Sequence, residues 1–235
     1  MTTYLIDNKT KQTETLTTVY DFIKDCISSG NLSIVTGYVT VGALSQLFID
    51  IEKNKEIFEY NIIIGELVKK SQTKKEKGLN LLTSIDSVLN IKQDAKNAID
   101  FLNLEKVKVR TVEPSFCHAK VYIFENNTKS NSAENFVIIG SSNLTEAGVG
   151  YSKSDKELNF RNFELNVLYQ DKVFKPTLTL MEESSKWYKK LWENHASENK
   201  LIYNYSKGVK VKESDKNFKQ FLIDEIQKNY ADPKT

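Results

Sequence analysis

The fold class follows from two neighbouring stretches, NLSIVTGYVTVGALSQLFIDIEK (31–53) and YNIIIGEL (60–67). Residues 31–40 and 60–67 are almost continuously apolar, which is typical of strands that are buried on both faces of a parallel sheet. Residues 41–53 lie between them and have the apolar spacing of a helix. Apolar strands that alternate with a helix predict an α/β fold.

The rest of the chain extends this pattern. A helical stretch runs from Leu79 to Leu102. Further strands are expected near KVKVRTV (106–112), FCHAKVYIF (116–124), NFVIIG (135–140) and FELNVLY (163–169). After about Pro176 the apolar spacing becomes helical again. We therefore expect an α/β catalytic domain over residues 1–175 and a C-terminal helical extension over residues 176–235 that packs on it.

Composition limits the classes to which the chain can belong. The hydrophobic fraction of 40% and the charged fraction of 27% are those of a globular protein with a buried core. The 33 basic and 31 acidic residues nearly cancel, so charge alone neither excludes nor indicates a nucleic-acid partner. The chain has no apolar run of the length of a membrane span, no signal-peptide pattern and only two cysteines, Cys26 and Cys117. We expect a cytoplasmic protein without a membrane partner.

The segment KKSQTKKEKG (69–78) is rich in lysine and poor in apolar residues. One interpretation is a solvated loop. The other is a loop that follows a phosphate backbone, because lysines without buried partners can displace the counterions of a nucleic acid. The candidate substrate-binding residues of this segment are Lys69, Lys70, Lys74, Lys75 and Lys77.

The stretch FCHAKVYIFE (116–125) contains the first candidate catalytic residues. In an extended strand the side chains alternate, so His118 and Lys120 share one face and the apolar face lies opposite. The two residues would lie roughly 7 Å apart and could hold one phosphate between them. A neighbouring cation favours the neutral, nucleophilic imidazole, and lysine binds anionic oxygens. The H-x-K pair alone is also compatible with an ordinary surface strand.

The stretch NFVIIGSSNLTEAG (135–148) reads as a buried strand that ends in a small polar cluster. Gly140 allows the backbone to approach a ligand closely. Ser141 and Asn143 are short neutral donors at a strand end, where α/β sheets place their sites. We expect Gly140 and Ser142 to contact the substrate as well. The alternative is a strand followed by a helix cap.

The stretch RNFELNVLY (161–169) alternates polar and apolar residues. Asn162, Glu164 and Asn166 share one face of the expected strand, opposite its apolar side chains. A carboxylate in such a strand needs a partner, and orienting a catalytic imidazole is one use for Glu164. A half-exposed edge strand is the alternative interpretation.

Together these residues resemble the signature of the phospholipase D superfamily, which reads H-x-K, then four residues and Asp, and later G-S-x-N. The matching residues are His118, Lys120, Gly140, Ser141, Ser142 and Asn143, followed by Glu164, where single-motif nucleases of the family keep a glutamate. The resemblance covers about residues 30–170 and implies a phospholipase D-like mixed sheet flanked by helices. One departure is Glu125, which stands at the position of the signature Asp.

The resemblance implies a metal-independent phosphodiesterase without a cofactor. One histidine attacks phosphorus and forms a phosphohistidine, while a second histidine protonates the leaving oxygen and later activates water. His118 is then the nucleophile, and the side chains of Lys120, Ser141 and Asn143 stabilise the charge on the phosphoryl oxygens. The two histidines and two cysteines lack metal-ligand spacing, so no metal site is expected.

The chain has a single H-x-K motif, because its other histidine, His195, is followed by Ser197 at the position of the lysine. A reaction that needs two histidines has to draw the second from another chain. The closed symmetric solution is a homodimer that shares one active site across a two-fold axis.

The single motif also bears on the substrate, because lipid-acting members of the superfamily typically carry two motifs. Single-motif members resemble metal-independent restriction endonucleases and the nuclease modules of some DNA helicases, so a helicase or restriction partner is expected. We rank DNA first as the substrate, RNA second and phospholipid third. The alternative from another class is a non-catalytic module that binds phosphate or nucleic acid within a larger system.

Overall fold

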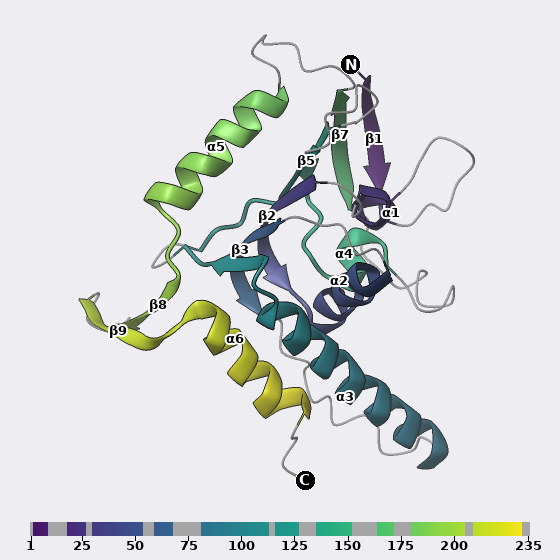
Figure 1. Cartoon of the computed structure of the whole chain (residues 1–235), viewed down its shortest axis with the longest axis vertical. Helices are drawn as coiled ribbons and strands as arrows, with labels where there is room; N and C mark the ends of the chain where they lie inside the picture. Colours follow the sequence, from purple (N-terminus) through teal and green to yellow (C-terminus); the bar gives the residue numbers. More distant parts are fainter. Residues whose placement is uncertain are drawn as a thin grey trace.

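The computed structural model of the chain describes residues 2–8, 18–26, 30–53, 59–67, 81–112, 116–126, 135–151, 164–171, 180–204 and 209–231. In this part of the chain, seven strands form one sheet in the order β1-β7-β6-β5-β2-β3-β4 (Figure 1). They are β1 (Thr2–Asp7), β2 (Gly30–Val39), β3 (Glu59–Leu67), β4 (Val107–Arg110), β5 (Val121–Asn126), β6 (Asn135–Gly140) and β7 (Leu165–Asp171). Strands β2, β3 and β4 are parallel, and the other neighbouring pairs are antiparallel. The predicted α/β fold with a mixed sheet is confirmed.

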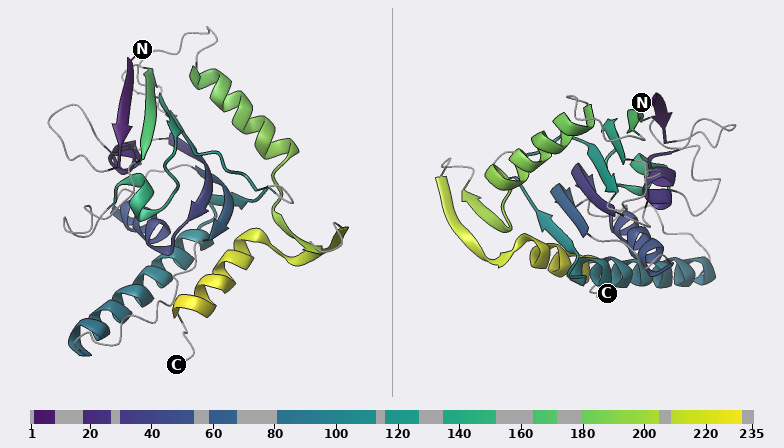
Figure 2. Two further views of the ribbon diagram at one scale, coloured as in Figure 1. Left: turned by 180° about the vertical axis from the view of Figure 1, so that it is seen from behind. Right: turned by 45° about the horizontal axis from the view of Figure 1, so that its top comes forward.

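Helices lie on both faces of this sheet (Figure 2). They are α1 (Val19–Cys26), α2 (Val41–Lys53), α3 (Leu81–Asn103), α4 (Glu146–Val149), α5 (Leu180–Asn194) and α6 (Phe218–Ile226). The larger core lies between one face and α1, α2, α3 and α6, and the smaller core lies beneath α5. Neighbouring residues of β2 point to opposite faces, so Ile34 belongs to the larger core and Val35 to the smaller one. Burial on both faces explains why this strand is almost continuously apolar.

Most elements that the sequence predicts are present, and the helix over residues 41–53 has the predicted bounds. The sequence analysis missed β1 and α1, because neither contains a long apolar run. It also placed the start of β5 too early, since the ladder between β5 and β6 begins at Val121.

The C-terminal extension contributes to both cores. Tyr188 of α5 belongs to the smaller core, and Phe218 and Leu222 of α6 belong to the larger one. Between these helices lies a hairpin of β8 (Asn199–Asn204) and β9 (Val209–Asn217), which the sequence analysis did not predict. A domain boundary at residue 175 stays a prediction.

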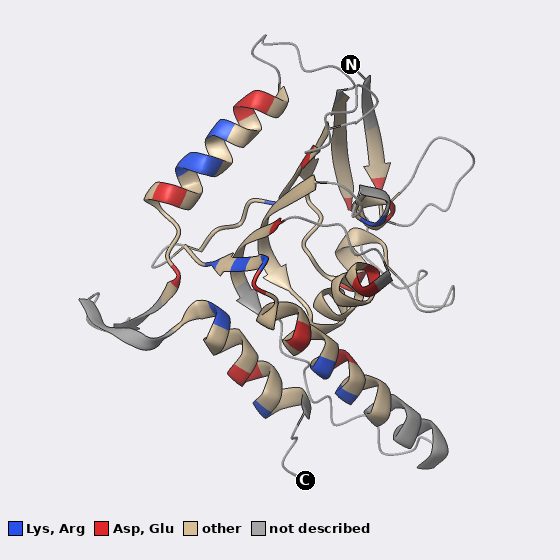
Figure 3. Ribbon diagram, in the orientation of Figure 1, with Lys and Arg blue, Asp and Glu red and all other residues tan. Residues whose placement is uncertain are grey.

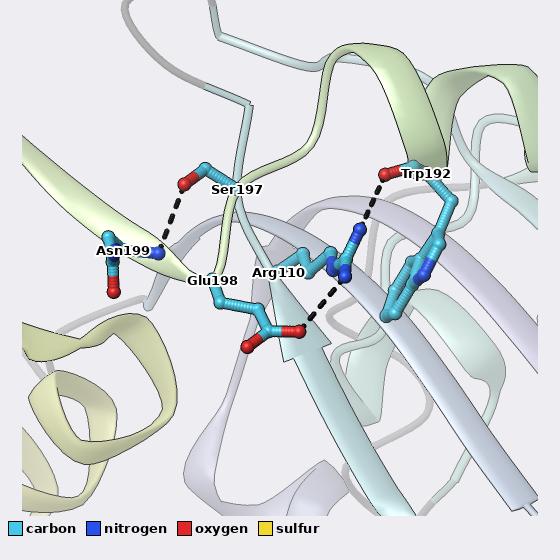
Figure 4. Close-up of polar contacts among 5 residues, drawn as sticks. All are labelled: Arg110, Trp192, Ser197, Glu198 and Asn199. Atoms are coloured by element: carbon cyan, nitrogen blue, oxygen red, sulfur yellow. Dashed lines mark hydrogen bonds and ion pairs between the residues drawn. The ribbon is translucent and has the colours of Figure 1, made fainter.

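Arg110 at the end of β4 joins the extension to the sheet (Figure 4). Its guanidinium donates to the Trp192 carbonyl oxygen at 2.7 Å and forms an ion pair with Glu198 at 2.9 Å. The same group lies 4.4 Å from the centroid of the Trp192 ring. Beside it, the backbones of Thr111 and Ser197 exchange two hydrogen bonds. These contacts hold the end of α5 at the β4 edge of the sheet.

Candidate active site

His118 and Lys120 lie on residues 116–120, which lead into β5 without pairing as a strand. The prediction of one strand over residues 116–124 is therefore wrong for its first half. From Val121 onward both faces of β5 are covered, because Tyr122 lies in the larger core and Ile123 in the smaller one. The polar surface is thus confined to the residues before the strand, where His118 is exposed and Lys120 is buried.

The Lys120 ammonium contacts both the ring and the backbone of His118. Nζ lies 2.9 Å from Nδ1 and 3.0 Å from Nε2 of the imidazole, and it donates to the His118 carbonyl oxygen at 2.6 Å. The separation of roughly 7 Å expected for an extended strand is therefore bridged by the lysine side chain. The contact therefore places a cation directly beside the imidazole ring.

Burial and charge act on Lys120 in opposite directions. Burial lowers the pKa of the Lys120 ammonium, and the Glu164 carboxylate acts to raise that pKa. Among the described residues, no hydrogen bond joins Glu164 to His118. The Glu164 carboxylate therefore acts on the lysine of the pair, and its expected role in orienting the imidazole stays a prediction.

The segment from Gly140 to Asn143 follows β6 and lies beside Lys120, because the Gly140 amide donates to the Lys120 carbonyl oxygen at 3.3 Å. Ser141 is exposed, and its hydroxyl oxygen accepts the Leu165 N–H at 3.1 Å. The Asn143 Oδ1 accepts the Tyr38 N–H at 3.1 Å. Because this oxygen is engaged, Nδ2 is the group with which Asn143 can donate to a phosphoryl oxygen.

Ser142 differs from the prediction, because it is fully buried and cannot contact a substrate in this structure. Its N–H donates to Asn166 Oδ1 at 3.2 Å, and its hydroxyl oxygen accepts from Asn166 Nδ2 at 2.8 Å. Its carbonyl oxygen accepts the Tyr122 hydroxyl at 2.9 Å. Ser142 therefore anchors the segment to β5 and β7 on its buried side, while Ser141 and Asn143 remain accessible.

Gly140 is needed at its position for a reason other than the expected one. A Cβ atom there would lie 2.6 Å from Asn166 Cα, and closer still to Asn166 Oδ1 and the Leu165 carbonyl oxygen. The close approach is thus between the ends of β6 and β7. Its predicted contact with the substrate stays a prediction.

Asn166 and Phe116 are two neighbours of the site to which the sequence analysis gave no role. It placed Asn166 on the face of Glu164, and the structure buries this side chain against Ser142. Phe116 is 46% exposed, with its ring centroid 5.2 Å from that of Tyr38 and 6.0 Å from that of His118. An aromatic residue two positions before the histidine was the available signal.

Glu125, at the position of the signature Asp, lies away from His118 at the other end of β5. Its carboxylate accepts the Ser185 hydroxyl of α5 at 2.8 Å, in a cleft between α5 and the sheet. The departure from the signature therefore affects the contact with α5. The lysine-rich segment 69–78 lies outside the described residues. Within the described part, no three His, Cys, Asp or Glu side chains are grouped as metal ligands.

A family model described as Tyrosyl-DNA phosphodiesterase matches residues 62–223. The match covers more than half of the 235 residues and includes the five candidate catalytic residues, His118, Lys120, Ser141, Asn143 and Glu164. It confirms the resemblance to the phospholipase D superfamily, of which that family is a member. None of the curated proteins matches the chain.

Similar solved structures have low sequence identity. NucT from Helicobacter pylori is 14% identical over 76% of this chain and 90% of its own, with a TM-score of 0.41. Yeast tyrosyl-DNA phosphodiesterase is 15% identical over 74% of this chain and 47% of its own, with a TM-score of 0.37. Phosphatidylserine synthase from Haemophilus influenzae is 11% identical over 83% of this chain and 39% of its own, with a TM-score of 0.42. The chain spans less than half of the latter two proteins.

Proposed function

The chain belongs to the tyrosyl-DNA phosphodiesterase family and is a phosphodiester hydrolase, and on this premise we propose that it cleaves DNA without a metal ion, through a phosphohistidine at His118. The observation that carries the proposal is the contact between the exposed His118 imidazole and the buried Lys120 ammonium. It places the expected nucleophile and a cation side by side. Exposed Ser141 and half-buried Asn143 add neutral donors beside them.

The contact suggests how binding starts the reaction. A phosphodiester oxygen binds the Lys120 ammonium, which brings the phosphorus beside the His118 imidazole. The imidazole nitrogen forms a bond to phosphorus while the bond from phosphorus to the leaving oxygen breaks. Lys120, Ser141 and Asn143 donate to the phosphoryl oxygens as their charge develops. Water then attacks phosphorus and gives its proton to the group that protonated the leaving oxygen, the P–N bond breaks, and the imidazole is restored.

The acid that protonates the leaving oxygen comes from a second copy of the chain. His195 follows α5 at the β4 edge, where Ser197 pairs with Thr111. Val121 on β5 and Arg110 on β4 lie in one row of paired residues that crosses β2 and β3. The two residues are therefore three strand spacings apart, or roughly 14 Å. His195 is thus held at a distant strand, and the partner subunit's His118 is the better candidate.

An exposed apolar row beside the site supports this homodimer. Leu5, Val167 and Ile139 are paired across β1, β7 and β6, and they are 58%, 37% and 36% exposed. Leu165 is 61% exposed and follows Glu164 directly. Exposed apolar patches mark interfaces, and this one adjoins a site that lacks its second histidine. A second copy that covers the row would bring its own site to the same edge.

Phe116 supports a substrate with a flat ring, because an exposed aromatic side chain 6.0 Å from the His118 ring can stack on a base or on a tyrosyl group. In Figure 3 the acidic residues of α5 lie toward its two ends and the basic residues between them, and Lys186 pairs with Glu182 at 2.8 Å. We propose that the lysine-rich segment 69–78 supplies the positive charge that binding to DNA requires. Among the described helices, none is long and apolar enough to cross a membrane. The cytoplasmic location and a helicase or restriction partner stay predictions.

The two histidines provide a matched test. Wild type, His118→Ala and His195→Ala are compared in EDTA on single-stranded DNA, double-stranded DNA, RNA and a tyrosine-linked DNA oligonucleotide. Wild type and His195→Ala should cleave at similar rates, and His118→Ala should not cleave. A labelled substrate should leave an acid-labile phosphoramidate on wild type and on His195→Ala, but not on His118→Ala.

Three outcomes would contradict the proposal. Activity of His118→Ala would exclude this nucleophile, and activity that requires added magnesium would indicate a metal mechanism. A wild type that binds these polymers without cleaving any of them would favour the non-catalytic module. The homodimer has its own assay, because excess His118→Ala subunits should suppress wild-type activity after subunit exchange, whereas a monomer would show only dilution.

A further inference from the structure

We propose that Asn166 is a positioning residue of the site. Its buried amide holds the segment from Gly140 to Asn143 in the position from which the side chains of Ser141 and Asn143 reach the phosphoryl oxygens. The inference rests on the proposed function, because it assigns a role relative to that reaction. It begins with the two ends of the Asn166 amide. Oδ1 accepts the Ser142 N–H at 3.2 Å, and Nδ2 donates to the Ser142 hydroxyl at 2.8 Å.

The amide is placed to act only on this segment. Asn166 is 1% exposed and therefore cannot reach a substrate itself. It lies on β7, opposite Gly140 of β6 in the ladder. Its Oδ1 fills the space that a Cβ atom at Gly140 would need. The backbone of Gly140 thus rests against the side chain that also fixes Ser142.

Further contacts fix the position of Ser142, which in turn determines where Ser141 and Asn143 lie. The Ser142 carbonyl oxygen is bound by the Tyr122 hydroxyl, so the residue is held from both β5 and β7. Ser141 and Asn143 are its direct neighbours in sequence and lie on the accessible side. A shift of Ser142 therefore moves both donors together. Misplacement of catalytic groups by about 1 Å can cost about 100-fold in rate.

A buried hydrogen-bonded asparagine could also serve stability alone, and the chain contains a control for that case. Asn97 is 8% exposed, and its amide groups bind Ser45 and Gln93 between α2 and α3. Asn166→Ala and Asn97→Ala remove the same groups from comparably buried positions. Both should lower the melting temperature, because Asn166→Ala removes the hydrogen bonds to buried Ser142, and Asn97→Ala removes the one that the buried Ser45 hydroxyl accepts.

The test compares kcat, KM and inhibition by vanadate for wild type, Asn166→Ala and Asn97→Ala on a cleavable DNA oligonucleotide, at a temperature where all are folded. Asn166→Ala should lower kcat about 10- to 100-fold and weaken vanadate inhibition by a similar factor, with KM nearly unchanged, because only the alignment of donors to phosphorus is lost. Asn97→Ala should keep the wild-type values. Equal kcat in the two variants, or a loss confined to KM, would overturn the inference.

Ser142→Ala is the second variant, in case Asn166→Ala does not fold. It removes the hydroxyl that Asn166 Nδ2 binds and keeps the hydrogen bond between Asn166 and the Ser142 backbone. Its kcat should fall by a smaller factor than that of Asn166→Ala, again at constant KM. Unchanged kcat in Ser142→Ala would also overturn the inference. Inactivity of wild type itself, or activity of His118→Ala, would instead refute the proposed function.

Discussion

Substitution of Gly140 by Ala measures how closely the ends of β6 and β7 approach each other. The added Cβ would lie 2.6 Å from Asn166 Cα, whereas ordinary contacts begin at 3.4 Å, so the backbone has to move by about 0.8 Å. Such overpacking costs about 1–3 kcal/mol, which outweighs the gain of about 0.4–1 kcal/mol from restricting the unfolded chain. The displaced backbone carries Ser141, so the reaction should slow as well.

Gly37→Ala is the matched control, because a Cβ there would lie 3.3 Å from Asn143 Oδ1 and 3.4 Å from the Cys117 carbonyl oxygen, beside the same site. Thermal unfolding followed by circular dichroism should show a melting temperature lowered by about 2–10 °C for Gly140→Ala and nearly unchanged for Gly37→Ala. The kcat of folded Gly140→Ala should fall about 10- to 100-fold. A Gly140→Ala variant with the stability and kcat of Gly37→Ala would refute the reasoning.

Two further predictions concern charge and association. Burial holds the pKa of Lys120 below the value near 10.4 of an unfolded chain, so the folded state gains stability as pH rises toward that value. The unfolding free energy of wild type should therefore rise relative to that of Lys120→Met between about pH 7 and about pH 10. Urea titrations at several pH values measure this difference, and a constant difference would contradict the prediction. Leu165→Arg should convert the homodimer to a monomer in sedimentation experiments and abolish cleavage. Leu89→Arg is the control, because Leu89 is 59% exposed and Leu165 is 61% exposed, and it should change neither property. A Leu165→Arg variant that is still a dimer would exclude the apolar row as the interface.

The elements and the candidate catalytic pair could be proposed from sequence because their signals are local. The helix over residues 41–53 depends on spacing within the helix itself, and the long apolar runs of β2 and β3 reflect burial on both faces. His118, Lys120, Ser141 and Asn143 were found because their order and spacing match a known signature. The edge strand β1 and the hairpin of β8 and β9 lack such runs, because strands of this kind depend on partners distant in sequence.

Only the tertiary structure decides which side chains of the signature meet and which way each one points. In a regular strand, alternation would place His118 and Lys120 on one face about 7 Å apart. The ladder between β5 and β6 starts only at Val121, and in the segment before it Nζ of Lys120 lies against the His118 ring. Ser141 and Ser142 are neighbours of the same residue type, and Asn166 and Tyr122 bind Ser142 in the interior while Ser141 stays accessible. The sequence by itself thus determined the candidate residues for the chemistry. Their burial, contacts and partners depend on long-range strand pairing, which local periodicity does not contain.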